Sequence, residues 1–359
     1  MSYKVLEPLG ATILDQLIES AARDPSAVAL RHKRRGVWVV WSWRDVVAAV
    51  DRYASALNRL GLESGSAVAF TGEISPDLIV AAVAARTAGA SLLSIAPLAK
   101  AAAIREKLAG DAVGSVRVAI VQGRAALAEW LDATTSSDRP IQIVFDHVTP
   151  DGRPPNSAVR LIADLRNHAP ANGWAERLAA GSNVAAPIKP ILWVEATTAW
   201  ADGLDAVIDS WISSGDALAL PELLAASVRD RREIKPNRWV ASAERVAALH
   251  AEIVSRLPLA RGVVGRIVAR ALRSGESSGS LAASLLATVL RQRLGLSRLR
   301  SIDVGGARGL STHNETAERL FAALGVPLRR IAPEAYGVEQ RDFVATGSLA
   351  RLALSGNAR

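Results

Sequence analysis

Cysteine is absent from this chain of 359 residues. Disulfide bonds, thiolate metal sites and cysteine nucleophiles are therefore excluded. Aromatic residues make up only 4% of the sequence, so binding of nucleic acid through stacked aromatic rings is not favoured. No apolar run reaches the roughly 18 residues of a membrane-spanning helix.

Conventional catalytic and metal-binding motifs have little support in the sequence. The pattern Gly-x-Ser-x-Gly, which serine hydrolases place in a sharp turn between a strand and a helix, occurs once, at residues 275–279, where it follows the basic segment at residues 260–273 and not an apolar strand pattern. The histidines are far apart in the sequence and do not have the spacing of metal ligands; they are His32, His147, His168, His250 and His313. We therefore assign no catalytic residue and no metal ligand from the sequence.

What is present is enough apolar material for a folded protein. Half of the residues are hydrophobic, which excludes disorder as the main state of the chain. A chain of this length usually forms two domains or subdomains. The segment MSYKVLEPLG at the start lacks the charged beginning and apolar centre of a secretory signal, and we expect a cytoplasmic protein.

The chain is basic, with 43 lysines and arginines against 35 acidic residues and a net charge of +8. Such a balance favours acidic partners in general. Basic clusters occur at residues 31–35, 229–232 and 291–300. We interpret them as solvated surface, with an anionic partner as the alternative; no nucleic-acid-binding motif accompanies them, so nucleic acid is not expected. Residues 260–273 form a basic amphipathic segment, which we interpret as a helix packed on the protein body, with peripheral membrane contact as the alternative.

Short apolar runs alternate with helical patterns along the chain. Strands are predicted at residues 68–71, 92–96, 116–121, 141–145, 191–195, 217–220, 238–241 and 300–304, and a hairpin between 27–30 and 37–41. Residues 43–60 have helical spacing and are followed by Gly61 as a stop signal, and Ser75 with Pro76 opens another helix. This rhythm predicts an α/β fold with mostly parallel sheets covered by helices.

Residues 191–204, ILWVEATTAWADGL, have the outline of a strand, a phosphate-binding loop and a helix. A loop that surrounds phosphate needs glycines, because any Cβ obstructs the approach of its N–H groups to the anion. Ala196 and Ala199 stand at those places. A positive charge about 4 Å from a phosphate contributes roughly 4 kcal/mol at an effective dielectric constant of about 20. Asp202 and Glu195 supply negative charge instead.

This segment resembles a motif of the AMP-forming acyl-CoA synthetases, the adenylate-forming family that includes long-chain fatty acid-CoA ligases. The family motif reads roughly ILYTSGTTGxPKGV and aligns with residues 191–204 without a gap. Thr197, Thr198 and Gly203 match it. The loop glycines are replaced by alanine, and Asp202 stands in place of the lysine that meets phosphate.

Other parts of the chain resemble the same family in the same order. These parts are residues 12–95, 215–246 and 299–328, the last with Gly305, Gly306 and Ala307 intact. Residues 335–340, AYGVEQ, stand where the family has GYGxTE, a motif whose aromatic residue stacks on adenine and whose Glu helps to bind magnesium. Tyr336 and Gly337 are retained, whereas Gln340 lacks the anionic oxygen that a hard cation prefers.

The resemblance implies the fold of the N-terminal domain of adenylate-forming enzymes, built of two subdomains. Residues 168–190 are rich in Pro, Gly and Asn and indicate a boundary. We therefore predict an N-terminal α/β subdomain at 1–180 and a second α/β subdomain at 181–359 that carries the altered AMP-binding motifs. Because the sequence ends at Arg359, the family's mobile C-terminal lid domain with its catalytic lysine is expected to be absent.

The altered motifs define a degenerate nucleotide site: Glu195, Thr197, Thr198, Asp202, Gly203, Gly305, Gly306, Ala307, Tyr336 and Gly337. We hypothesise a pseudoenzyme, a non-catalytic homologue without cofactor that acts as a structural or regulatory partner of another protein or as a homo-oligomer. One alternative is residual acyl-CoA ligase or acyl-adenylate-forming activity in fatty acid metabolism, which would imply ATP, magnesium, CoA and a lid supplied by another chain. The other alternative is a module that binds an acyl chain or an anionic ligand.

Overall fold

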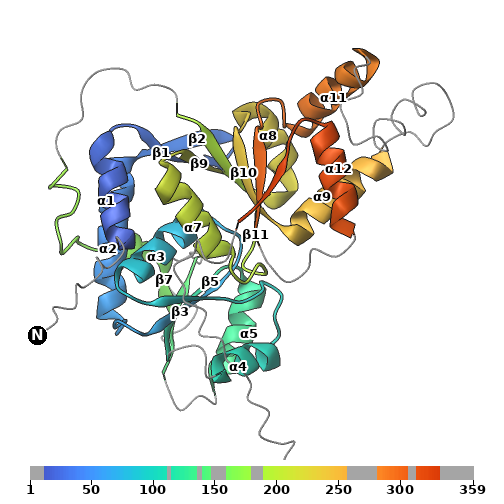
Figure 1. Ribbon diagram of the computed structural model, residues 1–359. Coiled ribbons are helices and arrows are strands. Elements are labelled where there is room, and N and C mark those ends of the chain that lie inside the picture. Colours follow the sequence, from blue (N-terminus) through green and yellow to red (C-terminus); the bar gives the residue numbers. More distant parts are fainter. Residues whose placement is uncertain are drawn as a thin grey trace, which may run out of the picture.

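Two β-sheets and the helices around them make up the fold (Figure 1). The computed structural model describes residues 12–110, 115–135, 140–146, 159–178, 189–256, 281–305 and 313–331. The strands are β1 (Val28–Arg34), β2 (Val37–Ser42), β3 (Ala67–Thr71), β4 (Ser91–Ser94), β5 (Val116–Val121), β6 (Gln142–Phe145), β7 (Val159–Leu161), β8 (Ile191–Val194), β9 (Ala217–Leu220), β10 (Arg238–Ser242), β11 (Ser301–Gly305) and β12 (Leu328–Arg330). The helices are α1 (Ile13–Arg23), α2 (Trp43–Arg59), α3 (Pro76–Thr87), α4 (Ala101–Ala109), α5 (Arg124–Thr135), α6 (Ile162–Arg166), α7 (Gly203–Ser214), the short η1 (Leu224–Ala226), α8 (Ser227–Ile234), α9 (Ala243–Arg256), α11 (Leu281–Leu294) and α12 (His313–Ala323).

Both sheets are almost entirely parallel. The seven-stranded sheet has the order β12-β11-β10-β8-β9-β1-β2, and only the β1–β2 hairpin within it is antiparallel. The five-stranded sheet has the order β4-β3-β5-β6-β7. Parallel strands need crossover connections, which the intervening helices supply.

Three apolar layers fill the space around the sheets, because alternate residues of each strand point to opposite faces. The central layer joins the two sheets: Phe70 of β3 and Val194 of β8 both contribute to it, together with α1, α2, α3 and α7. The outer face of the seven-stranded sheet packs against α9, α11 and α12, and the outer face of the five-stranded sheet packs against α4 and α5. The α3 and α7 helices are visible between the sheets in Figure 1.

Local signals place the helices that matter for the site. Ser42 and Asp45 form a capping box at the start of α2, and a similar box begins α1. At α3, the Ser75 side chain accepts a hydrogen bond from the backbone N–H of Leu78, and Pro76 occupies the first turn. The predicted opening of α3 at Ser75 and Pro76 is therefore confirmed.

The predicted fold class is confirmed, since the sheets are mostly parallel and covered by helices. The predicted strands and the hairpin are present within a few residues of their expected bounds. Strand β7 and helix α6 were missed, because their eight residues lie between Pro- and Gly-rich stretches that obscure a short pattern. The subdomain boundary near residue 180 stays a prediction. Sheet membership crosses it, because β1 pairs with β9.

Candidate functional site

The loop between β8 and α7, at residues 195–202, connects the two sheets. It runs beside the segment that follows β3: the backbone N–H of Ile74 donates to the carbonyl of Ala196 at 2.9 Å, and that of Thr198 donates to the carbonyl of Gly72 at 2.9 Å. These bonds form an isolated antiparallel bridge between Glu73 and Thr197. The strand, loop and helix are thus arranged as predicted, and the loop backbone is hydrogen-bonded to residues 72–74.

Thr198 fixes this junction with its side chain. The residue is 1% exposed. Its hydroxyl donates to the backbone carbonyl of Ile95 at 2.5 Å and accepts from the backbone N–H of Gly72 at 2.9 Å. Thr197 is only partly buried, and its hydroxyl accepts from the neighbouring backbone N–H of Ala199 at 3.2 Å. Of the two threonines that match the family motif, Thr198 therefore binds the other sheet and Thr197 bonds within its own loop.

Glu195 lies at the centre of a buried ionic cluster. Its carboxylate is 1% exposed and contacts two guanidinium groups, Arg231 at 2.6 Å and Arg245 at 2.7 Å. The indole N–H of Trp193 donates to it at 2.8 Å. The negative charge of Glu195 is thus compensated inside the protein and is directed at these partners. We refer to Glu195, Arg231 and Arg245 as the Glu195 cluster.

Arg231 corrects our interpretation of the basic clusters as solvated surface. Its side chain is fully buried. The guanidinium carbon lies 4.5 Å from the centre of the Trp239 ring, and Nε donates to the carbonyl of Leu294 at 3.3 Å. Lys33, in another of the clusters, is also buried and pairs with Asp230 at 3.0 Å. The sequence shows the cations but not their acidic partners, which lie far away along the chain.

The start of α7 carries several carboxylates. Asp202 is exposed at the N-cap position, and its side chain does not cap the helix. The pKa of Asp205 is raised to about 6, mainly by burial and also by the charges of Asp209 and Asp202, against the opposing effect of Arg86. Arg86 is the cation they share: it contacts Asp209 at 2.7 Å and Asp205 at 3.5 Å. The helix end that would meet a phosphate is therefore acidic.

Asparagine in place of Asp205 is expected to change how stability depends on pH. The pKa of this carboxyl is higher in the folded chain than its ordinary value of 3.8, so the folded state retains a proton that the unfolded state loses. Stability therefore falls as pH rises through roughly 4 to 6. We expect Asp205→Asn to raise the free energy of unfolding by about 1–2 kcal/mol at pH 7, with the gain fading towards pH 4. Denaturant titrations at both pH values measure this; Asp132→Asn, at an exposed site, is the control. A gain that is equal at both pH values contradicts the assignment.

Gly203 has a packing role at the first residue of α7. A Cβ at this position would lie 2.8 Å from ring atoms of Trp200. The Trp200 side chain is itself mostly buried, at 8% exposure for the residue. The indole ring thus covers the helix start, and glycine permits its close approach.

The remaining predicted residues fall into two groups. Gly305 ends β11 and is buried opposite Ser242 of β10, at the same sheet edge from which the 195–202 loop leaves β8. The structure therefore brings Gly305 to the edge that carries Glu195. Gly306, Ala307, Tyr336 and Gly337 lie outside the described residues, as does the basic segment at residues 260–273.

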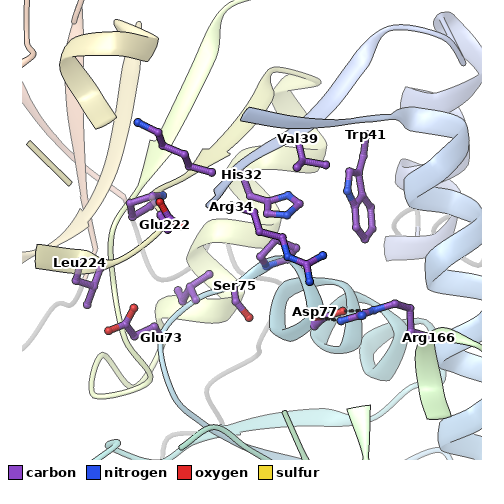
Figure 2. A pocket seen from close by; sticks show the side chains of 14 residues that line it. His32, Arg34, Val39, Trp41, Glu73, Ser75, Asp77, Arg166, Glu222 and Leu224 are labelled. Atoms are coloured by element: carbon purple, nitrogen blue, oxygen red, sulfur yellow. Dashed lines mark hydrogen bonds and ion pairs between the residues drawn. The ribbon is translucent and has the colours of Figure 1, made fainter. Parts of the chain in front are cut away.

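A cleft of about 410 Å³ opens on the other side of the 72–74 segment (Figure 2). The β1–β2 hairpin forms one wall, with His32, Arg34 and Trp41, and the start of α3 forms the other. Residues 221, 222 and 224, which follow β9, close one end together with Glu73. Because Glu73 is also bridged to Thr197, the cleft and the altered nucleotide loop share one structural segment.

Two cationic side chains in the cleft wall already form ion pairs with carboxylates of the protein. Arg166 of α6 contacts Asp77 through Nη2 at 2.5 Å and Nε at 3.2 Å, and the Tyr53 hydroxyl donates to the same carboxylate. Lys33 is neutralised by Asp230. These groups are therefore already partnered and form the frame of the cleft.

His32 lies in the wall without a partner for one of its ring atoms. Among the described residues, Nδ1 of His32 is buried and has no hydrogen-bond partner. Burial lowers the pKa of His32, and the nearby positive charges of Arg34 and Arg166 lower it further, whereas Asp77 raises it. The imidazole is accordingly neutral at pH 7 and presents a neutral ring to the cleft.

Sequence reasoning missed both the Glu195 cluster and the cleft. Arg231 and Arg245 are 36 and 50 residues from Glu195, so no local spacing connects them. The cleft takes its residues from five separated segments. Its one sequence signal was the basic cluster at residues 31–35, which the hairpin prediction explained as a solvated turn.

Metal-binding groups and membrane-spanning helices are absent from the part of the chain that the structure describes. It contains no group of three or more His, Cys, Asp or Glu side chains placed to bind a metal ion. Within the same residues, no helix combines the length and the apolar character needed to cross a bilayer.

Known proteins resemble the chain in sequence and in fold. Residues 17–172 match the family model of the AMP-binding enzymes. A stretch of 85 residues is 35% identical to the fatty acid–[acyl-carrier-protein] ligase MmaC of Mycobacterium marinum (strain ATCC BAA-535 / M); it covers 24% of this chain and 16% of that relative. This match thus concerns a small part of the relative's length.

Solved structures share the fold over most of the chain. The luciferase-like enzyme of the mealworm Zophobas morio superimposes with a TM-score of 0.58 at 12% identity, covering 90% of this chain and 72% of the other. The acyl-CoA synthetase of Brucella canis gives a TM-score of 0.55 at 15% identity, covering 87% and 56%. The predicted resemblance is confirmed: residues 17–172 match the AMP-binding enzymes, and most of the chain has an acyl-CoA synthetase-like fold.

Proposed function

We propose that this chain is a non-catalytic homologue of the AMP-forming acyl-CoA ligases that acts in the cytoplasm as a structural or regulatory partner, either of another protein or of a second copy of itself. The observation that carries the proposal is the acidic start of α7. Asp202 stands where the family motif has its phosphate-binding lysine. Its negative charge is one of the causes that raise the pKa of Asp205. A helix N-terminus ordinarily attracts phosphate, but these carboxylates oppose a phosphate there by charge repulsion.

The bonding of the loop supports the same proposal. Backbone groups of Ala196 and Thr198 are bonded to the segment after β3, and the Thr198 hydroxyl is occupied by two backbone partners. The Glu195 carboxylate is occupied by two arginines. The Thr198 side chain is thus committed to joining the two sheets, and the Glu195 side chain is committed to the two arginines.

Assays for the family's reaction test the proposal. The purified chain is incubated with ATP, magnesium, CoA and a panel of fatty and aromatic carboxylic acids; mass spectrometry detects acyl-CoA, and labelled pyrophosphate exchange detects acyl-adenylate. We expect neither signal above the protein-free blank, and Asp202→Ala to behave as the unchanged chain. Residual ligase activity of the chain itself predicts exchange with at least one acid. Chain-dependent exchange or thioester formation would overturn the proposal.

A further inference from the structure

The cleft beside the β1–β2 hairpin has an uneven distribution of charge. Once the ion pairs of Lys33 and Arg166 are set aside, three charged side chains in its wall have no ion pair among the described residues: Arg34, Glu73 and Glu222. Glu222 accepts a hydrogen bond from the backbone N–H of Gly36 at 3.1 Å, and Glu73 accepts one from the backbone of Leu224. Neither of these bonds neutralises a carboxylate charge.

The two signs of charge lie at different ends of the cleft. In Figure 2, Glu73 and Glu222 lie on the side of Leu224, whereas Arg34 and His32 lie towards Trp41 and Arg166. The acidic end belongs to segments that follow β3 and β9, and the basic end belongs to β1. Glu73 follows β3 of the five-stranded sheet, whereas Arg34 belongs to β1 of the seven-stranded sheet, so the fold holds these two charges apart. Glu222 follows β9, which pairs with β1 in the same sheet.

Apolar groups contribute to the wall of the same cleft. Val39 and Trp41 of β2 line it on the hairpin side, and Ile74 and Leu224 line it on the opposite side. Trp41 packs edge-on against His32, with ring centres 6.2 Å apart. The cleft therefore offers apolar contact together with charged groups of both signs, which is the usual composition of a small-molecule site.

Partial desolvation favours a partner at the acidic end. Glu73 is exposed as a residue, but the protein around its carboxyl removes part of the water and raises its pKa. A cationic group beside Glu73 would restore a favourable interaction for the charged carboxylate. An anionic group would find such an interaction with Arg34, and a hydrogen-bond donor in the neutral ring of His32.

We infer that the cleft binds a small zwitterion, with its cationic group beside Glu73 and Glu222, its anionic group against Arg34 and His32, and an apolar part in contact with Trp41. Charges of both signs on one ligand match the lining, whereas a simple anion leaves the acidic end unpartnered and a simple cation leaves Arg34 unpartnered. The inference is independent of whether the chain retains ligase activity.

Three probes of matched length test this inference by titration calorimetry on the full chain. They are 6-aminohexanoate, which carries both charges, hexanoate, which carries the anion alone, and hexylamine, which carries the cation alone. We expect 6-aminohexanoate to bind at least about fivefold more tightly than either single-charge probe, since each exposed ion pair contributes up to about 1 kcal/mol.

Substitutions at the two ends assign the orientation. Arg34→Gln is expected to weaken the binding of 6-aminohexanoate and hexanoate several-fold and to leave that of hexylamine unchanged. Glu73→Gln is expected to weaken the binding of 6-aminohexanoate and hexylamine several-fold and to leave that of hexanoate unchanged. Arg35→Gln, at the exposed neighbouring position that does not line the cleft, is the matched control and should change nothing. Equal affinity for the three probes, no binding of 6-aminohexanoate, or binding that both substitutions leave unchanged would overturn the inference.

Discussion

Replacement of Glu195 by glutamine is expected to lower the free energy of unfolding by about 3–5 kcal/mol. Glutamine has nearly the same shape but removes the charge, so that Arg231, which is fully buried, loses its compensating carboxylate. Breaking a buried pair by removing one partner costs this much because the other charge stays in a medium of low polarity. Urea denaturation monitored by tryptophan fluorescence gives the free energy directly.

A second substitution separates loss of charge from simple disruption. Arg231→Met, added to Glu195→Gln, removes the uncompensated guanidinium while keeping an unbranched apolar side chain against Trp239. Arg245 is 29% exposed and can reach solvent. We expect the double variant to regain most of the lost stability. A cost of Glu195→Gln below about 1 kcal/mol, or a double variant less stable than the single one, would contradict the role of the Glu195 cluster.

Valine in place of Thr198 is expected to cost about 2–3 kcal/mol of unfolding free energy. The change keeps the branched shape but removes the hydroxyl, so that the buried N–H of Gly72 and the carbonyl of Ile95 lose a partner. An unsatisfied buried polar group costs about 1–3 kcal/mol.

Thr197→Val supplies the matched control in the same loop. Its hydroxyl is partly exposed and bonds only to a neighbouring backbone N–H at 3.2 Å. We expect a loss of less than about 1 kcal/mol in the same denaturation experiment. Equal losses for the two threonines would show that the loop does not join the sheets through Thr198.

The fold was largely predictable because its signals are local. Helix starts such as Ser42 with Asp45, and Ser75 with Pro76, combine a capping residue with helical periodicity. Buried parallel strands appear as short apolar runs, and β5 and β9 are examples. These patterns lie within a few residues of each other, so the sequence alone carries them.

The candidate site was predictable only in part. The order of strand, loop and helix at residues 191–204 followed from the motif, but the partners of Glu195 did not. The sequence suggested that Glu195 adds negative charge for a phosphate to meet; in the structure, Arg231 and Arg245 neutralise it. Of the two loop carboxylates, Glu195 and Asp202, only Asp202 is exposed. Long-range pairing of this kind depends on the register of distant elements, which no local pattern encodes.

The proposal that the chain is non-catalytic depends on whether the start of α7 still accepts a nucleotide. Isothermal titration calorimetry of the purified chain with ATP and excess magnesium measures this most directly. We predict no binding heat beyond dilution, because Asp202 and Asp205 oppose the phosphates and the loop bonds to the neighbouring sheet. Saturable, magnesium-dependent binding of ATP would contradict it.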